Sequence, residues 1–153
     1  THLLVCAGRA TVAVQNALRA TPAGPLRITF LPTLTQVDFD HLLWACDLNY
    51  VRGEDSVVRA IWAGKPLVWQ IYPQDDDAHH DKLNAFLDML QAPPTLRQHH
   101  GLWNSAAAWD GTATPAPLMH LKEWAKTVSA ARRRLLEMDD LTSQLCAFVQ
   151  KKR

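Results

Sequence analysis

One stretch of the chain, Tyr50-Val51-Arg52-Gly53-Glu54-Asp55-Ser56-Val57-Val58, carries the strongest signal for the fold. A short strand ends there, Gly53 permits a tight turn, and a helix begins at about Asp55. The first backbone N–H groups of a helix have no partner within the helix, and here they point out of the carboxyl end of the strand. The stretch therefore predicts an α/β fold with a natural site for a diphosphate at a strand end.

The flanking segments continue this alternation of strands and helices. Strands are predicted over residues 2–6, 26–31, 48–51 and 67–72, and helices over residues 9–20, 37–45 and 55–63. Such alternation is typical of a Rossmann-like parallel sheet with helices on both faces, which binds ligands outside the carboxyl ends of its strands. The part that follows is predicted to be mostly helical, over residues 78–91, 95–108 and 118–150.

The composition suits a single globular domain over residues 1–153, with 48% apolar and 20% charged residues. A formal net charge of +1 argues against nucleic acid or an acidic membrane as a partner. Cys6, Cys46 and Cys146 show no disulfide spacing, so we expect buried, reduced thiols and a cytoplasmic location. Residues 2–7 are apolar but too few to span a membrane.

The acidic residues at the predicted helix start leave two interpretations open. Asp55 and Ser56 could simply cap the helix, or they could face the hydroxyl groups of a sugar or ribose beside a bound diphosphate. A metal is not expected. The run Asp75-Asp76-Asp77 cannot easily converge on one ion. The pairs His79-His80 and His99-His100 have no third ligand in the sequence, so these histidines are expected on helix faces.

The order of segments after Ser56 resembles the donor site of glycosyltransferases of the GT-B type. Trp62-Ala63-Gly64-Lys65-Pro66 precedes a strand, and Tyr72-Pro73-Gln74-Asp75 follows it. In GT-B enzymes the helix start meets the diphosphate of a nucleotide sugar, and the later loop meets the sugar. The resemblance implies that this chain is the C-terminal, donor-binding half of such an enzyme.

A denser match narrows the resemblance to the bacterial elongation factor P arginine rhamnosyltransferases. It is carried by Leu31-Pro32, Gln36, Asp38-Phe39-Asp40, the run from Leu42 to Asn49, the run from Val51 to Ser56, Ile71 to Asp75, Ala78-His79 and Asp81-Lys82-Leu83. Together these residues make up roughly a third of the chain. The remainder resembles the family in layout only.

This resemblance implies an inverting transfer from dTDP-β-L-rhamnose to an arginine of elongation factor P, without a cofactor. Residue by residue, it implies that Gln36 and Phe39 hold the thymine, that Tyr72 touches the diphosphate, and that Gly53, Glu54, Asp55 and Ser56 meet the ribose, diphosphate or sugar. Glu54 would be needed for activity. Thr33 departs from the family, which tends to have an aromatic residue there to stack on the thymine.

The aspartates that activate the acceptor in this family belong to an N-terminal domain, and no segment here resembles them. We therefore expect this chain to work together with such a domain and to be inactive alone. The alternative is a stand-alone module that binds a nucleotide sugar or another protein without catalysis.

Overall fold

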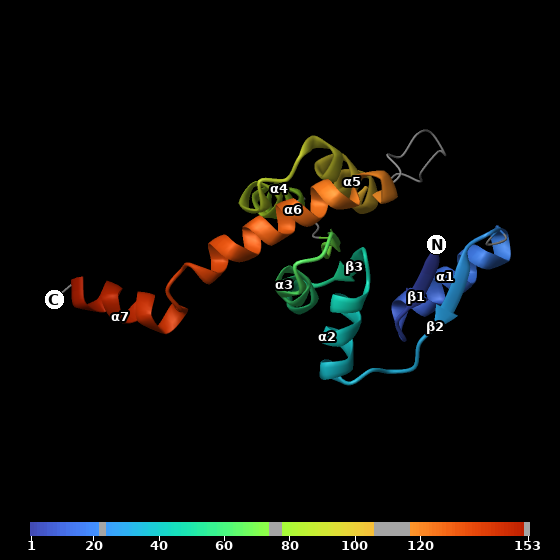
Figure 1. Ribbon diagram of the computed structural model, residues 1–153, viewed down its shortest axis with the longest axis horizontal. Coiled ribbons are helices and arrows are strands. Elements are labelled where there is room, and N and C mark those ends of the chain that lie inside the picture. Colours follow the sequence, from blue (N-terminus) through green and yellow to red (C-terminus); the bar gives the residue numbers. More distant parts are fainter. Residues whose placement is uncertain (22–23, 74–77, 106–116, 152–153) are drawn as a thin grey trace. The chain divides into compact units, whose positions relative to one another are not determined.

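The computed structural model describes residues 1–21, 24–73, 78–105 and 117–151, which form four short strands and seven helices (Figure 1). The elements in chain order are β1 (His2–Val5), α1 (Arg9–Ala20), β2 (Arg27–Phe30), α2 (Gln36–Ala45), β3 (Asn49–Arg52), α3 (Glu54–Ala63), β4 (Leu67–Gln70), α4 (Ala78–Leu90), α5 (Pro94–Asn104), α6 (Pro117–Leu136) and α7 (Leu141–Lys151). The α/β class and the alternation predicted from the sequence are confirmed.

The strands pair in parallel, but the described residues contain two two-stranded sheets where the sequence led us to expect one sheet. β1 pairs with β2 and β3 pairs with β4. The chain likewise divides into two compact units, residues Thr1–Leu42 and Leu43–Arg153. Apolar alternation predicts that a segment is a strand but does not determine which strands lie beside it, and the expected single sheet is not confirmed by the described residues.

The first unit is a small β-α-β arrangement. Hydrogen bonds join the strands beyond their ends, from Leu31 N–H to the Val5 carbonyl (2.8 Å) and from Arg27 N–H to the Thr1 carbonyl (3.2 Å). The Thr11 hydroxyl ties α1 to the end of β1 by donating to the Cys6 carbonyl at 3.0 Å. No residue of α1 is buried.

The second unit begins with another β-α-β arrangement, which places the predicted site. Val51 of β3 lies beside Trp69 of β4, so the carboxyl ends of the two strands come together. α3 connects them and ends at Gly64, whose φ of 69° is left-handed, as expected for the glycine after a helix. Residue Pro66 then starts the return into β4, in the order that the sequence predicts.

Three helices cover this unit around one apolar core, and in Figure 1 α6 (orange) runs alongside α4 and α5 (olive). The core is centred on Trp124 of α6, which is fully buried and donates its indole N–H to the Thr95 hydroxyl at 3.1 Å. Trp124 therefore packs the helices of this unit together. Trp103 is 46% exposed, and Trp109 lies outside the described residues.

α5 closes one edge of β4 with side chains. The His100 ring accepts a hydrogen bond from Trp69 N–H at 3.0 Å, and Asn104 receives Ile71 N–H at 2.9 Å while donating to the Trp69 carbonyl at 2.9 Å. Two side chains one helical turn apart thus bond backbone groups that a further strand would otherwise satisfy. His99 and His100 lie on a helix, as the sequence predicts, and both are buried.

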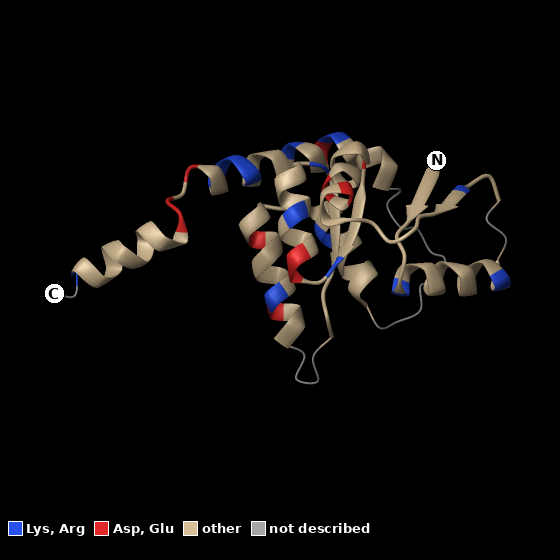
Figure 2. Ribbon diagram, turned by 90° about the horizontal axis from the view of Figure 1, so that it is seen from below, with Lys and Arg blue, Asp and Glu red and all other residues tan. Residues whose placement is uncertain are grey.

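The helix predicted over residues 118–150 is interrupted between Leu136 and Leu141. Asp140 begins a new helix, since its carboxylate accepts hydrogen bonds from both the N–H (3.1 Å) and the hydroxyl (2.6 Å) of Ser143. Figure 2 shows the acidic residues of this linker in red, directly after the basic end of α6. This order suits both helix dipoles, because cations favour a helix C-terminus and anions favour an N-terminus.

The cysteines are less buried than expected: Cys6 and Cys46 are partly exposed and Cys146 is exposed. Partial burial, with the nearby carboxylate of Asp47, raises the pKa of Cys46 and keeps it protonated. Within the described residues, no helix has the length and apolar character to span a membrane.

Candidate functional site

Gly53 joins β3 to α3 in a backbone conformation that only glycine adopts easily, with φ 79° and ψ 168°. Two aromatic side chains pack against it. The Trp69 indole N–H donates to the Gly53 carbonyl at 3.1 Å, and a Cβ placed on Gly53 would lie only 3.0 Å from the Tyr72 hydroxyl. The glycine is therefore needed both for the turn and for the close approach of Tyr72.

Arg52 and Tyr72 form a second contact at the same strand ends. The guanidinium carbon of Arg52 lies 4.7 Å from the centre of the Tyr72 ring, which is a cation–π distance. Among the described residues, the buried Nε of Arg52 has no hydrogen-bond partner. A buried donor without an acceptor lowers the stability of the fold, and a bound ligand with an oxygen acceptor would remove that cost.

Glu54 begins α3 and is held by a lysine from another helix. The Lys82 ammonium on α4 lies 2.7 Å from the Glu54 carboxylate. This hydrogen bond, helped by the backbone N–H of Glu54 itself, holds the pKa of the carboxyl below its ordinary value. The sequence interpretation placed the helix start at about Asp55, and the structure places it one residue earlier.

Asp55 and Ser56 follow on the first turn of α3, and neither caps the helix. The N-cap position belongs to Gly53, which offers no side chain. Asp55 instead forms an ion pair with Arg59 one turn later, at 3.0 Å. Two acidic side chains at a helix start would disfavour a bound anion there. The negative charges of Glu54 and Asp55 are, however, both offset by cations.

Gln36 and Phe39 lie on the first turn of α2, and the cap of this helix is the neighbouring Thr35. The Thr35 hydroxyl accepts a hydrogen bond from Asp38 N–H at 3.1 Å and donates to the Asp38 carboxylate at 2.6 Å. Gln36 is therefore an exposed amide that does not cap the helix, and Phe39 is only partly buried. Thr33 is exposed before the helix.

The structure brings Gly53, Glu54, Asp55, Ser56 and Tyr72 together at the ends of β3 and β4. Gln36 and Phe39 belong to the first unit, and their place in a common site with the strand ends stays a prediction. The acidic run 75–77 lies outside the described residues. Among the residues that the structure does describe, no group of three or more His, Cys, Asp or Glu could hold a metal ion.

A partly buried pair joins β3 to α5. The Tyr50 hydroxyl and His99 Nε2 share a hydrogen bond of 2.8 Å, and Trp103 packs against Tyr50 with ring centres 4.6 Å apart. Burial raises the pKa of Tyr50 to about 12 and lowers that of His99, so both groups are neutral near pH 7. This pair fixes α5 beside β3.

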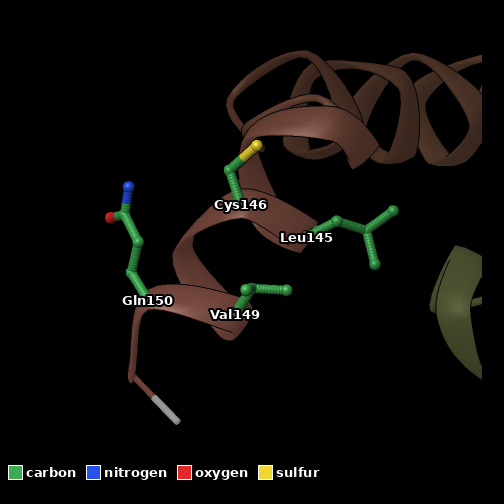
Figure 3. Close-up of a pocket in the computed structure, with 4 residues that line it drawn as sticks. All are labelled: Leu145, Cys146, Val149 and Gln150. Carbon is green, nitrogen blue, oxygen red and sulfur yellow. The ribbon is translucent and has the colours of Figure 1, made fainter. Parts of the chain in front are cut away.

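A separate hollow on α7 takes no part in this arrangement. Figure 3 shows that its four lining residues come from one helix: Leu145, Cys146, Val149 and Gln150. None of them is buried.

Three residues of the site were not assigned roles from the sequence. Arg52 carries a weak signal, because it directly precedes a strand-end glycine. Lys82 and Trp69 carry none, since their roles depend on α4 and β4 meeting the start of α3.

Comparison with known proteins gives one consistent family. The family described as "Elongation-Factor P (EF-P) rhamnosyltransferase EarP" matches residues 1–150. Proteins named protein-arginine rhamnosyltransferase are similar: that of Pseudomonas putida is 50% identical over 96% of this chain, and that of Pseudomonas aeruginosa is 38% identical over 95%. The chain spans 42% of the length of each of these relatives.

A solved structure has the same fold over almost the whole chain. It bears the description "Structural basis for EarP-mediated arginine glycosylation of translation elongation factor EF-P", and its similarity has a TM-score of 0.77 at 34% identity. The match covers 99% of this chain and 52% of the solved one. With the family match extending over nearly every residue, the chain belongs to the EarP family of elongation factor P rhamnosyltransferases.

Proposed function

We propose that this chain is the donor-binding part of an inverting glycosyltransferase, and that it binds dTDP-β-L-rhamnose for transfer to an arginine of elongation factor P. The family match and the relatives' names support the reaction class. The identity of the donor rests on the resemblance of Gln36, Phe39 and the Gly53–Ser56 stretch to the family. The arrangement at the strand ends supports a diphosphate as the group bound there.

One observation carries the proposal: the buried, unpartnered Nε of Arg52 lies beside Tyr72 and the open start of α3. A diphosphate offers oxygen acceptors to the guanidinium, the Tyr72 hydroxyl and the first N–H groups of the helix. Tyr72 is 47% exposed, so its hydroxyl can reach a ligand. Glu54 and Asp55, already paired with cations, can accept hydrogen bonds from sugar or ribose hydroxyls.

The proposed reaction is an inverting displacement at the anomeric carbon of the donor. A guanidino nitrogen of the acceptor forms a bond to the anomeric carbon of rhamnose, while the bond from that carbon to the diphosphate oxygen breaks. The bonding electrons leave with dTDP, whose developing charge Arg52 and the helix start stabilise. The acceptor nitrogen loses one proton to a base, which we place in the part of the enzyme that lies outside this chain.

Calorimetry with dTDP tests the proposal. Arg52→Met should weaken dTDP binding about ten-fold or more, since a charge-assisted hydrogen bond to a phosphate contributes about 1.5–3 kcal/mol. Arg133→Met removes the same charge from an exposed position on α6 and should leave the affinity near that of the unchanged chain. Equal dTDP affinity in the Arg52 variant and the unchanged chain would exclude a diphosphate at this site.

A further inference from the structure

Lys82 contacts the candidate site from α4, a helix whose buried residues pack in the core. Its ammonium lies 2.7 Å from the Glu54 carboxylate and 5.8 Å from the centre of the Trp69 ring. Trp69 is 3% exposed, and its indole N–H is bound to the Gly53 carbonyl. The lysine thus links α4 to the first residue of α3, and its ammonium lies above the buried Trp69 ring.

Glu54 needs such a restraint if it is to meet a ligand in one orientation. Its side chain is exposed and has three rotatable bonds, and from its own helix the carboxylate is met by the backbone N–H of Glu54. Asp55, the next acid, is held by Arg59 of the same helix, whereas Glu54 is held from outside. The two acids therefore differ in what fixes them.

We propose that Lys82 is a positioning residue for the donor site, which holds the Glu54 carboxylate oriented toward the sugar nucleotide. The inference rests on the proposed function, because it takes Glu54 to meet the donor. Lys82 acts through Glu54 and not by binding the diphosphate itself. The same ammonium offsets the negative charge that Glu54 would otherwise bring to a diphosphate site.

The lowered pKa of Glu54 agrees with this geometry, since the hydrogen bond from Lys82 is its largest cause. Loss of the lysine should therefore raise the pKa of this carboxyl toward that of an ordinary glutamate. A purely structural role of Lys82, confined to packing α4, would leave that titration unchanged.

The first experiment follows the carboxyl carbon of Glu54 by NMR in the glutamate-labelled chain, with Glu54→Gln to assign the signal. Lys82→Met should move the Glu54 titration to higher pH, and Lys82→Arg should keep it low. Lys122→Met, which removes an exposed lysine of α6, is the matched control and should not move it. An unchanged titration in Lys82→Met overturns the inference whether or not the chain binds a nucleotide sugar.

The second experiment measures dTDP-rhamnose binding by calorimetry in a double-mutant cycle. Lys82→Met alone should weaken binding about five-fold, which corresponds to the upper range for an exposed ion pair. In the Glu54→Gln background the same change should have no further effect. An equal loss in both backgrounds would mean that Lys82 binds the donor directly and would overturn its positioning role.

The two proposals can fail separately. If the unchanged chain binds no dTDP-rhamnose, the proposed function fails while the titration still tests the Lys82–Glu54 contact. If the chain binds the donor and the titration does not respond to Lys82, only the positioning role fails.

Discussion

At the scale of single residues, Gly53 is the position at which the backbone and the site depend on each other most. Its left-handed φ disfavours residues that carry a side chain, and its contact with Tyr72 leaves no space for one. The Trp69 indole N–H also donates to the Gly53 carbonyl, whose position depends on this backbone conformation. A change here should therefore reach the turn, the tyrosine and the start of α3 together.

Gly53→Ala should lower the free energy of unfolding by about 1–3 kcal/mol, because alanine must adopt a strained conformation and displace Tyr72. It should also weaken dTDP binding, which urea unfolding and calorimetry can measure on the same sample. Gly101→Ala is the control: Gly101 lies inside α5 with nothing within 4 Å of an added Cβ, so alanine should stabilise the helix slightly. A Gly53→Ala chain as stable as the unchanged chain would contradict the role given to this turn.

Phe39 and Gln36 belong to the same scale, because their proposed roles are contacts with one base. Phe39 is only partly buried, so Phe39→Ala should weaken dTDP binding about ten-fold without unfolding the chain. Gln36→Ala should reduce the preference for dTDP over ADP and GDP, since its amide suits the imide edge of thymine. Calorimetry with the three diphosphates checks both results. If ADP or GDP binds the unchanged chain as tightly as dTDP, the base pocket is assigned wrongly.

At the scale of elements, the contact between α5 and β4 determines how the site strand is held. His100 is fully buried, and its Nε2 must accept from Trp69 N–H, so its Nδ1 carries the proton that is donated to the Leu96 carbonyl at 3.0 Å. In the neutral form of His100, both ring nitrogens therefore have a hydrogen-bond partner. Asn104 adds three more hydrogen bonds to the same strand and helix.

Burial lowers the pKa of His100 to about 4 in the folded chain, against 6.5 for an ordinary histidine. Between these values the unfolded chain binds the extra proton, so stability is complete above about pH 6.5 and falls as the pH is lowered toward 4. Because of this group, the free energy of unfolding measured with urea should be about 2 kcal/mol lower at pH 5 than at pH 7. His2→Gln, which removes an exposed histidine, should leave the difference unchanged. A His100 resonance that titrates near pH 6.5 in the folded chain would refute this assignment.

At the scale of the whole molecule, the chain spans two fifths of the length of the curated relatives, and the proposed function assigns it no base for the acceptor. We expect this chain to bind dTDP-rhamnose but to transfer nothing to unmodified elongation factor P. Mass spectrometry of elongation factor P after incubation with chain and donor checks this. A rhamnose mass increment on one arginine would show that the base lies within these residues.

The division of the chain into two units also belongs to this scale. Each unit contains one pair of parallel strands, and each pair is joined by one helix. Phe39 belongs to the first unit and Arg52 to the second. The calorimetric tests of these two residues therefore examine the contribution of each unit to dTDP binding separately.

Local chemistry allowed the sequence by itself to determine most of the elements and to indicate part of the candidate site. Apolar periodicity and the glycines at positions 53 and 64 place strands and helices nearly where they lie, because these signals act within a few residues. The motif after β3 likewise indicates Gly53, Glu54, Asp55 and Ser56. The tertiary structure alone decided which strands pair, that His100 closes an edge of β4, and that Lys82 holds Glu54 across 28 residues. Those contacts join residues far apart in the chain, and their energy depends on packing that no local pattern records.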